Sequence, residues 1–274
     1  SLPSTLTIIC DEAFSKCVSL ESIDIPDSVT FIEFAAFMEC RKLKSIVLPK
    51  NLRQIPENAF MYCDSMLNVV IPYGVTTIIT RAFAYCAFKE ITIPDSVTSL
   101  SGFEVFKSNS KLLSVKFSEN LDYIGYGSFS YCTSLKFIKF PDSLTSIGSG
   151  MFIYCLSLQT VIFPCNVQKI GDYIFTYCSS LTSIAYNGTN FVDSIEITSK
   201  NDDFSLLTVY VPLNYDGETF IGLPVVKVDI DSLNFTDDYE EYESSPISEE
   251  ITTNEDEVST SDSSCEDIIQ NCLE

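Results

Sequence analysis

One feature constrains this chain more than any other, because phenylalanine recurs at a constant step of 23 residues. The series has eight positions: Phe14, Phe37, Phe60, Phe83, Phe106, Phe129, Phe152 and Phe175. Cysteine follows three residues after all but one of them, at Cys17, Cys40, Cys63, Cys86, Cys132, Cys155 and Cys178. Asn109 takes the place of the missing cysteine. A fixed period of about 20–50 residues is typical of stacked repeats, so we expect a repeat solenoid of 23-residue rungs.

Each copy also contains a short segment of alternating hydrophobicity. Residues 20–25 read L-x-x-I-x-I, the strand signature of a leucine-rich repeat. In a strand, Ile23 and Ile25 lie on one face and Asp24 on the other. A Pro-Asp-Ser turn then ends the strand, since proline has no backbone N–H to donate; it recurs at 26–28, 94–96 and 141–143. The pattern predicts rungs that form a parallel β-sheet face, with few or no long helices.

A single rung is not expected to be stable alone. Fully burying one of its apolar side chains contributes roughly 1.5–3 kcal/mol, whereas ordering the chain costs about 1.5 kcal/mol per residue. Stacked rungs cover one another's open faces, so stability is expected to be cooperative between neighbours.

The unit A-F-x-x-C-x-x-L-x-x-I-x-I-P-x-x-V-x-x-I, over residues 3 to about 187, resembles the BspA-like (type 5) leucine-rich-repeat family. Residues 210–225 resemble the C-terminal cap of its protist members. The resemblance implies a cell-surface or secreted protein that binds host or matrix proteins or other cells, and it transfers no catalytic residue. We expect a solenoid at 1–187 of about eight rungs, the first partial, and a cap at 188–230. Residues 231–274 form an acidic tail, expected to be disordered because it has few apolar residues.

Charge and composition exclude several classes of function. The formal net charge is −22, and residues 229–274 hold sixteen of the 38 acids and no Lys or Arg. No basic patch is expected for nucleic acid or an anionic membrane. No apolar stretch in the sequence is long enough to predict a membrane-spanning helix.

The chain has no histidine, which removes the Ser-His and Cys-His nucleophile pairs. The constant spacing of the cysteines matches no zinc pattern. We therefore expect no enzyme activity, no metal and no cofactor. The repeated cysteines are expected to be buried free thiols, with disulfides between neighbouring rungs as the alternative, since parallel Cβ vectors give poor disulfide geometry.

The outward strand positions are the candidate binding surface. Six of them combine apolar and basic side chains: Val47, Val70, Lys116, Phe137, Lys139 and Ile162. A row of apolar residues on one sheet face suggests a partner footprint, although strand propensity alone also selects such residues. A second repeated row precedes the cysteines, at Tyr62, Tyr85, Tyr131, Tyr154 and Tyr177. We interpret this row as a stacked structural ladder, with a binding stripe as the alternative.

These observations predict a non-catalytic module for a protein or glycoprotein ligand, acting in adhesion or recognition at the cell surface or outside the cell. The alternative is a cytoplasmic scaffold with an acidic regulatory tail. If the chain is secreted, Asn187 and Asn234 are possible glycosylation sites, since both lie in Asn-x-Thr sequons.

Overall fold

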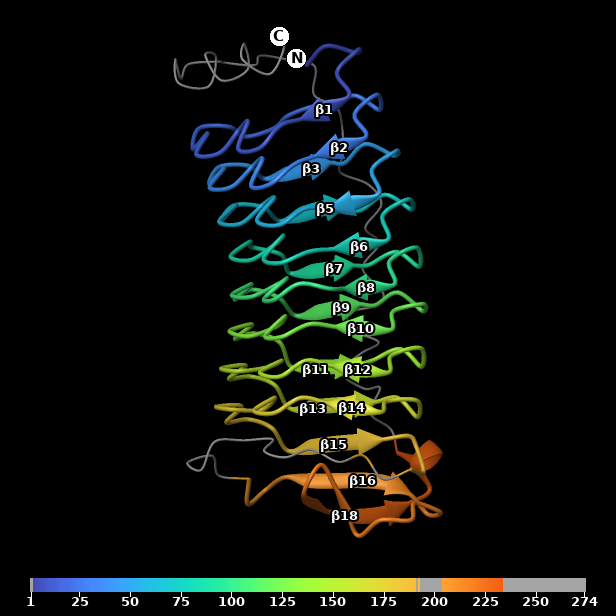
Figure 1. Cartoon of the computed structure of the whole chain (residues 1–274). Coiled ribbons are helices and arrows are strands. Elements are labelled where there is room, and N and C mark those ends of the chain that lie inside the picture. Colours follow the sequence, from blue (N-terminus) through green and yellow to red (C-terminus); the bar gives the residue numbers. More distant parts are fainter. Residues whose placement is uncertain (1, 191, 193–203, 234–274) are drawn as a thin grey trace.

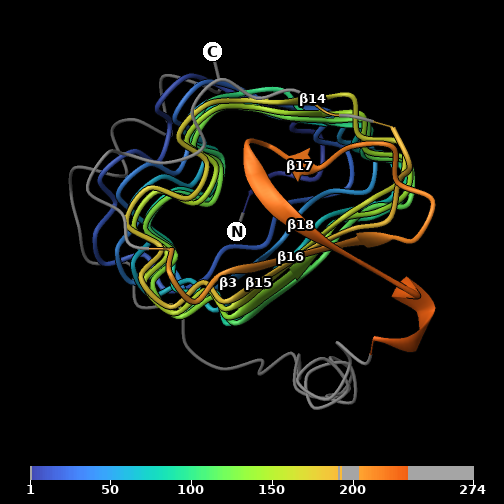
Figure 2. The same cartoon turned by 90° about the horizontal axis from the view of Figure 1, so that it is seen from below.

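The chain forms a solenoid in which short rungs stack along one axis (Figure 1). The structure is a computed structural model, and it describes residues 2–190, 192 and 204–233. Viewed along the axis, the rungs superimpose in one closed outline with a sheet on each of two opposite sides (Figure 2). The predicted repeat solenoid is confirmed, and the 3₁₀ helix η1 (Ile230–Ser232) is the single helix within the described residues.

The first of the two sheets, the strand sheet, takes one short strand from each rung. Its strands are β3 (Ser45–Val47), β5 (Asn68–Val70), β7 (Glu90–Thr92), β9 (Ser114–Lys116), β11 (Phe137–Lys139), β13 (Thr160–Phe163) and β15 (Ser183–Tyr186). Every strand pair among them is parallel. The predicted strand at 20–25 is reduced to a single bridge between Asp24 and Val47.

The second sheet, here called the back sheet, was not predicted from the sequence as a separate sheet. Its two-residue strands are β1 (Ile8–Ile9), β2 (Phe31–Ile32), β4 (Gln54–Ile55), β6 (Thr77–Ile78), β8 (Ser99–Leu100), β10 (Tyr123–Ile124), β12 (Ser146–Ile147) and β14 (Lys169–Ile170). Strands β4 to β14 pair in one parallel series. The second residue of each strand is buried, and it is isoleucine except in β8, which has leucine. Each rung thus contributes a further inward side chain here.

The irregular rung between Cys86 and Ser118 changes the register without breaking the stack. Thr77 pairs with Ser99, one residue short of the period, and Ser99 pairs with Tyr123, one residue beyond it. The segment from β6 to β8 is thus one residue shorter than the period, and the segment from β8 to β10 is one residue longer. In the strand sheet, β7 and β9 pair with each other but not with β5 or β11. Gly102 lies at the regained position, where a Cβ atom would come within 1.9 Å of the Thr80 nitrogen, so the added residue fits because it has no side chain.

The eight repeated phenylalanines form the central column of the core. All are buried, and successive rings are stacked with centroids 5.1–6.3 Å apart. The constant step places each ring over the ring of the preceding rung. This column is the direct structural consequence of the period in the sequence.

The repeated cysteines donate hydrogen bonds between rungs. Each Sγ lies 3.0–3.4 Å from the carbonyl oxygen of the phenylalanine 26 residues earlier, as in Cys40, Cys63, Cys86, Cys132, Cys155 and Cys178. Asn109 preserves this bond, because its Nδ2 donates to the Phe83 carbonyl at 2.8 Å. The position therefore requires a side chain that is small and that can also donate a hydrogen bond to the phenylalanine carbonyl of the preceding rung.

Six of the seven repeated cysteines are buried free thiols, as expected. Cys17 differs from that expectation, because it is disulfide-bonded.

The burial of the six free thiols predicts how they react. Burial raises the pKa of the Cys40 and Cys132 thiols to about 12, and the thiolate is the reactive form. In the native protein without reductant, exposed Cys165 should react with iodoacetamide while the six buried thiols stay unmodified. In denaturant all six should react, as peptide mass spectrometry would show. Modification of Cys132 at the rate of Cys165 in native protein would contradict the buried-thiol assignment.

Three further strands extend the strand sheet beyond β15. Strand β16 (Thr208–Pro212) pairs with β15, and β18 (Leu223–Val228) pairs with β16, both in parallel. Strand β17 (Thr219–Phe220) is antiparallel to β18. Phe220 is buried, with its ring 4.4 Å from that of Tyr186 and 5.6 Å from that of Phe163. We propose that this unit caps the core, since an uncovered last rung would expose its apolar face.

Candidate protein-binding face

The outer side of the strand sheet, here called the strand face, consists of the first and third side chains of each strand. The middle side chain points inward and is buried in all of these strands except β5, where Val69 is partly buried. In-register pairing aligns the third positions in three groups, Val47 with Val70, Thr92 with Lys116, and Lys139 with Ile162 and Ala185. The three groups follow one another along the solenoid and are here called the row (Figure 1).

Four of the six predicted binding residues are exposed in that row. Val47 and Val70 lie opposite each other in paired strands and are 53% and 49% exposed. Lys116 and Lys139 are also exposed, at the ends of β9 and β11. The row therefore changes from apolar to basic along the axis, over side chains that solvent reaches.

Ile162 is a correction, because it is 8% exposed and belongs to the buried residues. Alternation fixes the direction of a strand side chain, but its burial depends on its neighbours. Ile162 pairs with Lys139 on one side and with Ala185 on the other, and Ala185 pairs with Tyr210 of β16. Ile162 and Ala185 thus lie in register between Lys139 and Tyr210, at the end of the row where β16 and β18 continue the sheet. Ile162 is removed from the candidate surface.

Phe137 occupies the first position of β11, in register with Thr160. Its side chain is half-buried, so the largest apolar residue predicted on this face offers only part of its ring to a partner. Lys139 lies two residues further along the same strand, so both side chains are on the strand face, and β9, which carries Lys116, is the preceding strand of this face. The structure thus keeps an aromatic group and basic groups within one small area.

The tyrosine row lies on a flank of the solenoid rather than on the strand face. Its rings stack in two groups, Tyr62 with Tyr85 at 4.3 Å, and Tyr131, Tyr154 and Tyr177 at 4.8 and 4.4 Å. All five residues have φ near +60°, in the left-handed region that costs energy for side chains other than glycine. Backbone N–H groups of this row donate to the following rung, for example Tyr62 to Ala84. The stacking agrees with the structural interpretation of this row.

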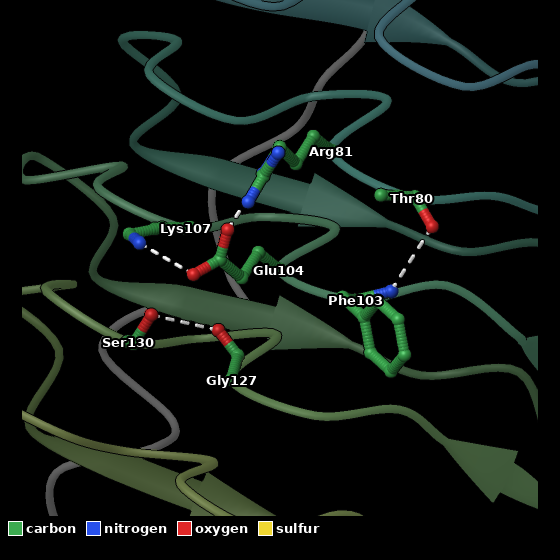
Figure 3. A network of polar contacts seen from close by, with 7 residues as sticks. All are labelled: Thr80, Arg81, Phe103, Glu104, Lys107, Gly127 and Ser130. Carbon is green, nitrogen blue, oxygen red and sulfur yellow. Dashed lines mark hydrogen bonds and ion pairs between the residues drawn. The ribbon is translucent and has the colours of Figure 1, made fainter.

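A charged cluster at the irregular rung was not predicted from the sequence. Glu104 is buried and accepts from Arg81 at 2.6 Å and from Lys107 at 2.5 Å (Figure 3). Burial raises the pKa of Glu104, but the hydrogen bonds from Lys107 and Arg81 outweigh it, so the pKa lies below its ordinary value. Arg81 and Glu104 are one repeat period apart, and that spacing is the signal that could have indicated the contact.

The aromatic neighbours of this cluster are exposed. Phe103 is 61% exposed and its ring meets that of Tyr126 edge-on at 6.2 Å. The Phe103 backbone nitrogen donates to the Thr80 hydroxyl at 3.2 Å (Figure 3). With all of its charges paired, the Glu104 cluster links two successive rungs and holds no free acid–base pair.

A groove of about 400 Å³ lies at the end of the tyrosine row. Tyr154, Leu156, Tyr177, Phe204 and Leu206 contribute its aromatic and aliphatic walls. Such walls can accept an apolar side chain.

Metal-binding clusters and membrane-spanning helices are both absent from the part of the chain that the structure describes. No group of three or more His, Cys, Asp or Glu side chains there is arranged to hold a metal ion. Over the same residues, no helix has the length and apolar character needed to cross a membrane. Of the two possible glycosylation sites, Asn187 is exposed, and Asn234 lies outside the described residues, as does the predicted tail from residue 234 onward.

The stacked 23-residue rungs, with short parallel strands on two sides and a buried Phe–Cys column, define a leucine-rich-repeat solenoid. A family model described as BspA type Leucine rich repeat region, with six copies, matches residues 1–112 and 101–215. The chain belongs to this family, and the predicted resemblance is confirmed. Leucine-rich-repeat proteins in general bind other proteins and are not enzymes. No curated protein matches the sequence significantly.

Several solved structures are similar in fold. A leucine-rich repeat protein from Bacteroides ovatus is 22% identical, with 82% of this chain and 77% of that chain covered and a TM-score of 0.48. The leucine-rich repeat protein of T. pallidum is 24% identical, covering 65% and 72%, with a TM-score of 0.44. A leucine-rich cell surface protein from Faecalibacterium prausnitzii is 24% identical, covering 68% and 70%, with a TM-score of 0.33.

Proposed function

We propose that the chain is a non-catalytic module that recognises a protein or glycoprotein ligand through its strand face. The observation that carries this proposal is the accessible row of Val47 and Val70 followed by Lys116 and Lys139, with Phe137 beside it. Contiguous exposed apolar side chains mark interaction sites in soluble proteins. Aromatic residues at the centre of a footprint and charges at its rim are typical of protein interfaces.

The size of the strand face limits how a partner can bind. Seven strands at a spacing of about 4.8 Å span about 29 Å, and three residues span about 10 Å. The resulting area of about 300 Å² is smaller than the roughly 800 Å² that one partner contributes to a standard interface. A protein ligand must therefore also contact the segments next to the strands, where Lys89 and Lys136 precede β7 and β11.

We further propose that the protein acts in adhesion or recognition at the cell surface, which the family membership supports. Antibody labelling of intact cells should then detect it. Labelling that requires permeabilised cells would support the alternative, a cytoplasmic scaffold with an acidic regulatory tail. Both alternatives place the ligand on the strand face, so the labelling experiment tests where the protein is located and leaves the binding site to a separate test.

The binding site is tested by changing the two ends of the row separately. Val47→Asp with Val70→Asp, and Lys116→Glu with Lys139→Glu, should each weaken binding to intact epithelial cells or immobilised matrix extract at least about tenfold. Because these side chains are exposed, unfolding free energy should change by about 1 kcal/mol or less per substitution. Surface plasmon resonance and urea unfolding measure the two effects.

The matched control places the same charge on exposed aromatic residues elsewhere. Phe31→Asp, on the back sheet, and Phe103→Asp, near the Glu104 cluster, should leave binding unchanged. Loss of binding in these controls, with binding retained in the strand-face variants, would place the partner on the other side of the solenoid. Loss only on changing Tyr131 and Tyr154 to serine would place it on the flank.

A further inference from the structure

The row on the strand face changes its chemistry in a fixed order along the solenoid axis. Val47 and Val70 come first and are apolar, Thr92 follows, and Lys116 and Lys139 come next, all of them exposed. The two residues that follow Lys139 in the row are buried. The accessible part of the row therefore extends from β3 to β11, which is four rung spacings, or about 19 Å.

The basic end of the row is not neutralised by its surroundings. Lys116 and Lys139 form no ion pair with another residue of 2–190, 192 or 204–233, and the same holds for Lys89 and Lys136, which directly precede β7 and β11. All four lysines are exposed, and β9 lies against both β7 and β11. Half-buried Glu90 is the single acid among the outward positions of these three strands. The basic end therefore keeps an excess of positive charge.

Acidic side chains limit the basic end on one side. Asp95, Glu119 and Asp142 are exposed in the turns that follow β7, β9 and β11. Like charges brought opposite each other disfavour a partner, so a broad polyanion is repelled where it extends over these turns. A sulfated glycan also has no apolar side chains to place over the valine end of the row. The row therefore suits a narrow ligand that is apolar at one end and acidic at the other.

We propose that the row binds an extended segment of a partner protein, which places apolar side chains over Val47 and Val70 and carboxylates over Lys116 and Lys139. A segment of about six extended residues spans about 20 Å, so it covers the accessible row from end to end. One exposed ion pair is weak, whereas several carboxylates and an apolar contact act together and fix the direction in which the segment lies. This inference rests on the proposed function and adds the chemistry of the ligand to it.

Selection from a random peptide library on the immobilised full chain tests this chemistry. The selected peptides should carry apolar residues followed or preceded by Asp and Glu. Selection on the double variant Lys116→Glu with Lys139→Glu should lose the preference for acids. The matched control is Lys16→Glu with Lys169→Glu, because both lysines are exposed, lie away from the strand face and form no ion pair within the described part of the chain. This control should select the same peptides as the unmodified chain.

Fluorescence anisotropy with a selected peptide then measures the affinity. The Kd should rise at least about tenfold in the Lys116 and Lys139 variant, and also on raising NaCl from about 0.1 M to about 1 M, because salt screens exposed charges. A peptide of the same composition with its acidic and apolar residues interleaved should bind more weakly. Equal binding of the two peptides, no preference for acids in the selection, or equal affinity of the lysine variant and its matched control would each overturn the proposal.

Other occupants of the row give different results. Heparin is the probe for a sulfated glycan, and heparin binding that depends on Lys116 and Lys139, with no acidic peptide selected, would overturn the proposal. Dimers of the full chain that dissociate in the same lysine variant, as seen by sedimentation, would place a second copy on the row and also overturn it. Cell binding lost in the strand-face variants, with no acidic peptide selected, would retain the proposed function and remove this inference. Peptides bound through the row, with cell binding unchanged in those variants, would retain the peptide site and remove the proposed function.

Discussion

Replacing Phe83 with alanine is expected to lower the free energy of unfolding by about 3–5 kcal/mol, as is usual when a large buried side chain leaves a cavity. Phe83 is fully buried, with its ring stacked between Phe60 at 5.4 Å and Phe106 at 5.7 Å. Phe88 contacts its edge at 5.7 Å. Stacked rungs cannot collapse into this cavity without disturbing both neighbours, so the loss should lie near the upper part of this range. Urea unfolding followed by circular dichroism measures it.

The matched control is the same substitution at an exposed ring. Phe103→Ala should change the unfolding free energy by less than about 1 kcal/mol, since Phe103 is mostly exposed and contacts Tyr126 only at an edge. Equal losses in the two variants would mean that the phenylalanine column is not the main stabilising element. A loss in Phe83→Ala of less than about 1 kcal/mol would contradict its burial in a rigid core.

Ile162→Asn is expected to destabilise the fold by about 3 kcal/mol or more, although the residue points outward. Asparagine removes about 2 kcal/mol of apolar burial and leaves amide groups in a site with few hydrogen-bond partners, at a further cost of about 1–3 kcal/mol. An uncharged substitution is chosen because an aspartate here could pair with Lys139, which is in register with Ile162. Thermal and urea unfolding would report the change.

Val47→Asn is the control at the equivalent position of another rung. Val47 is half exposed, so this change should alter the unfolding free energy by about 1 kcal/mol or less. If Ile162→Asn proved as mild as Val47→Asn, Ile162 would return to the candidate binding surface. Comparing the two variants therefore measures whether Ile162 is buried in the folded protein while Val47 is exposed.

The core was the part of this protein most open to prediction from sequence. The phenylalanine of the Phe60 position occurs in all eight rungs, and the cysteine of the Cys63 position occurs in seven of them, both at a constant step of 23 residues. When rungs of equal length stack, a constant step places equivalent residues directly above one another. The alternation of Ile46 and Val47 likewise fixes which side chain faces inward. Both arguments use local geometry, which the sequence specifies.

The back sheet was harder to predict, because strands of two residues, such as Gln54–Ile55, are too short to show a period of two. The Glu104 cluster shows a related difficulty. Each of its residues looks like an ordinary surface charge in the sequence, and only the stacking of rungs brings Arg81 against Glu104. Contacts between rungs depend on side-chain length and turn shape as well as on the period.

The sequence by itself determined the repeat length, the inward Phe–Cys columns and the outward direction of the strand side chains, because each follows from a spacing along the chain. Tertiary structure decided which outward residues solvent reaches: Val47 remains exposed and Ile162 is buried. It also gathered lysines from different positions of the repeat, including Lys89 and Lys116, over adjacent strands. Accessibility and local charge depend on neighbours across the stack, and those neighbours lie about one full repeat away in the chain.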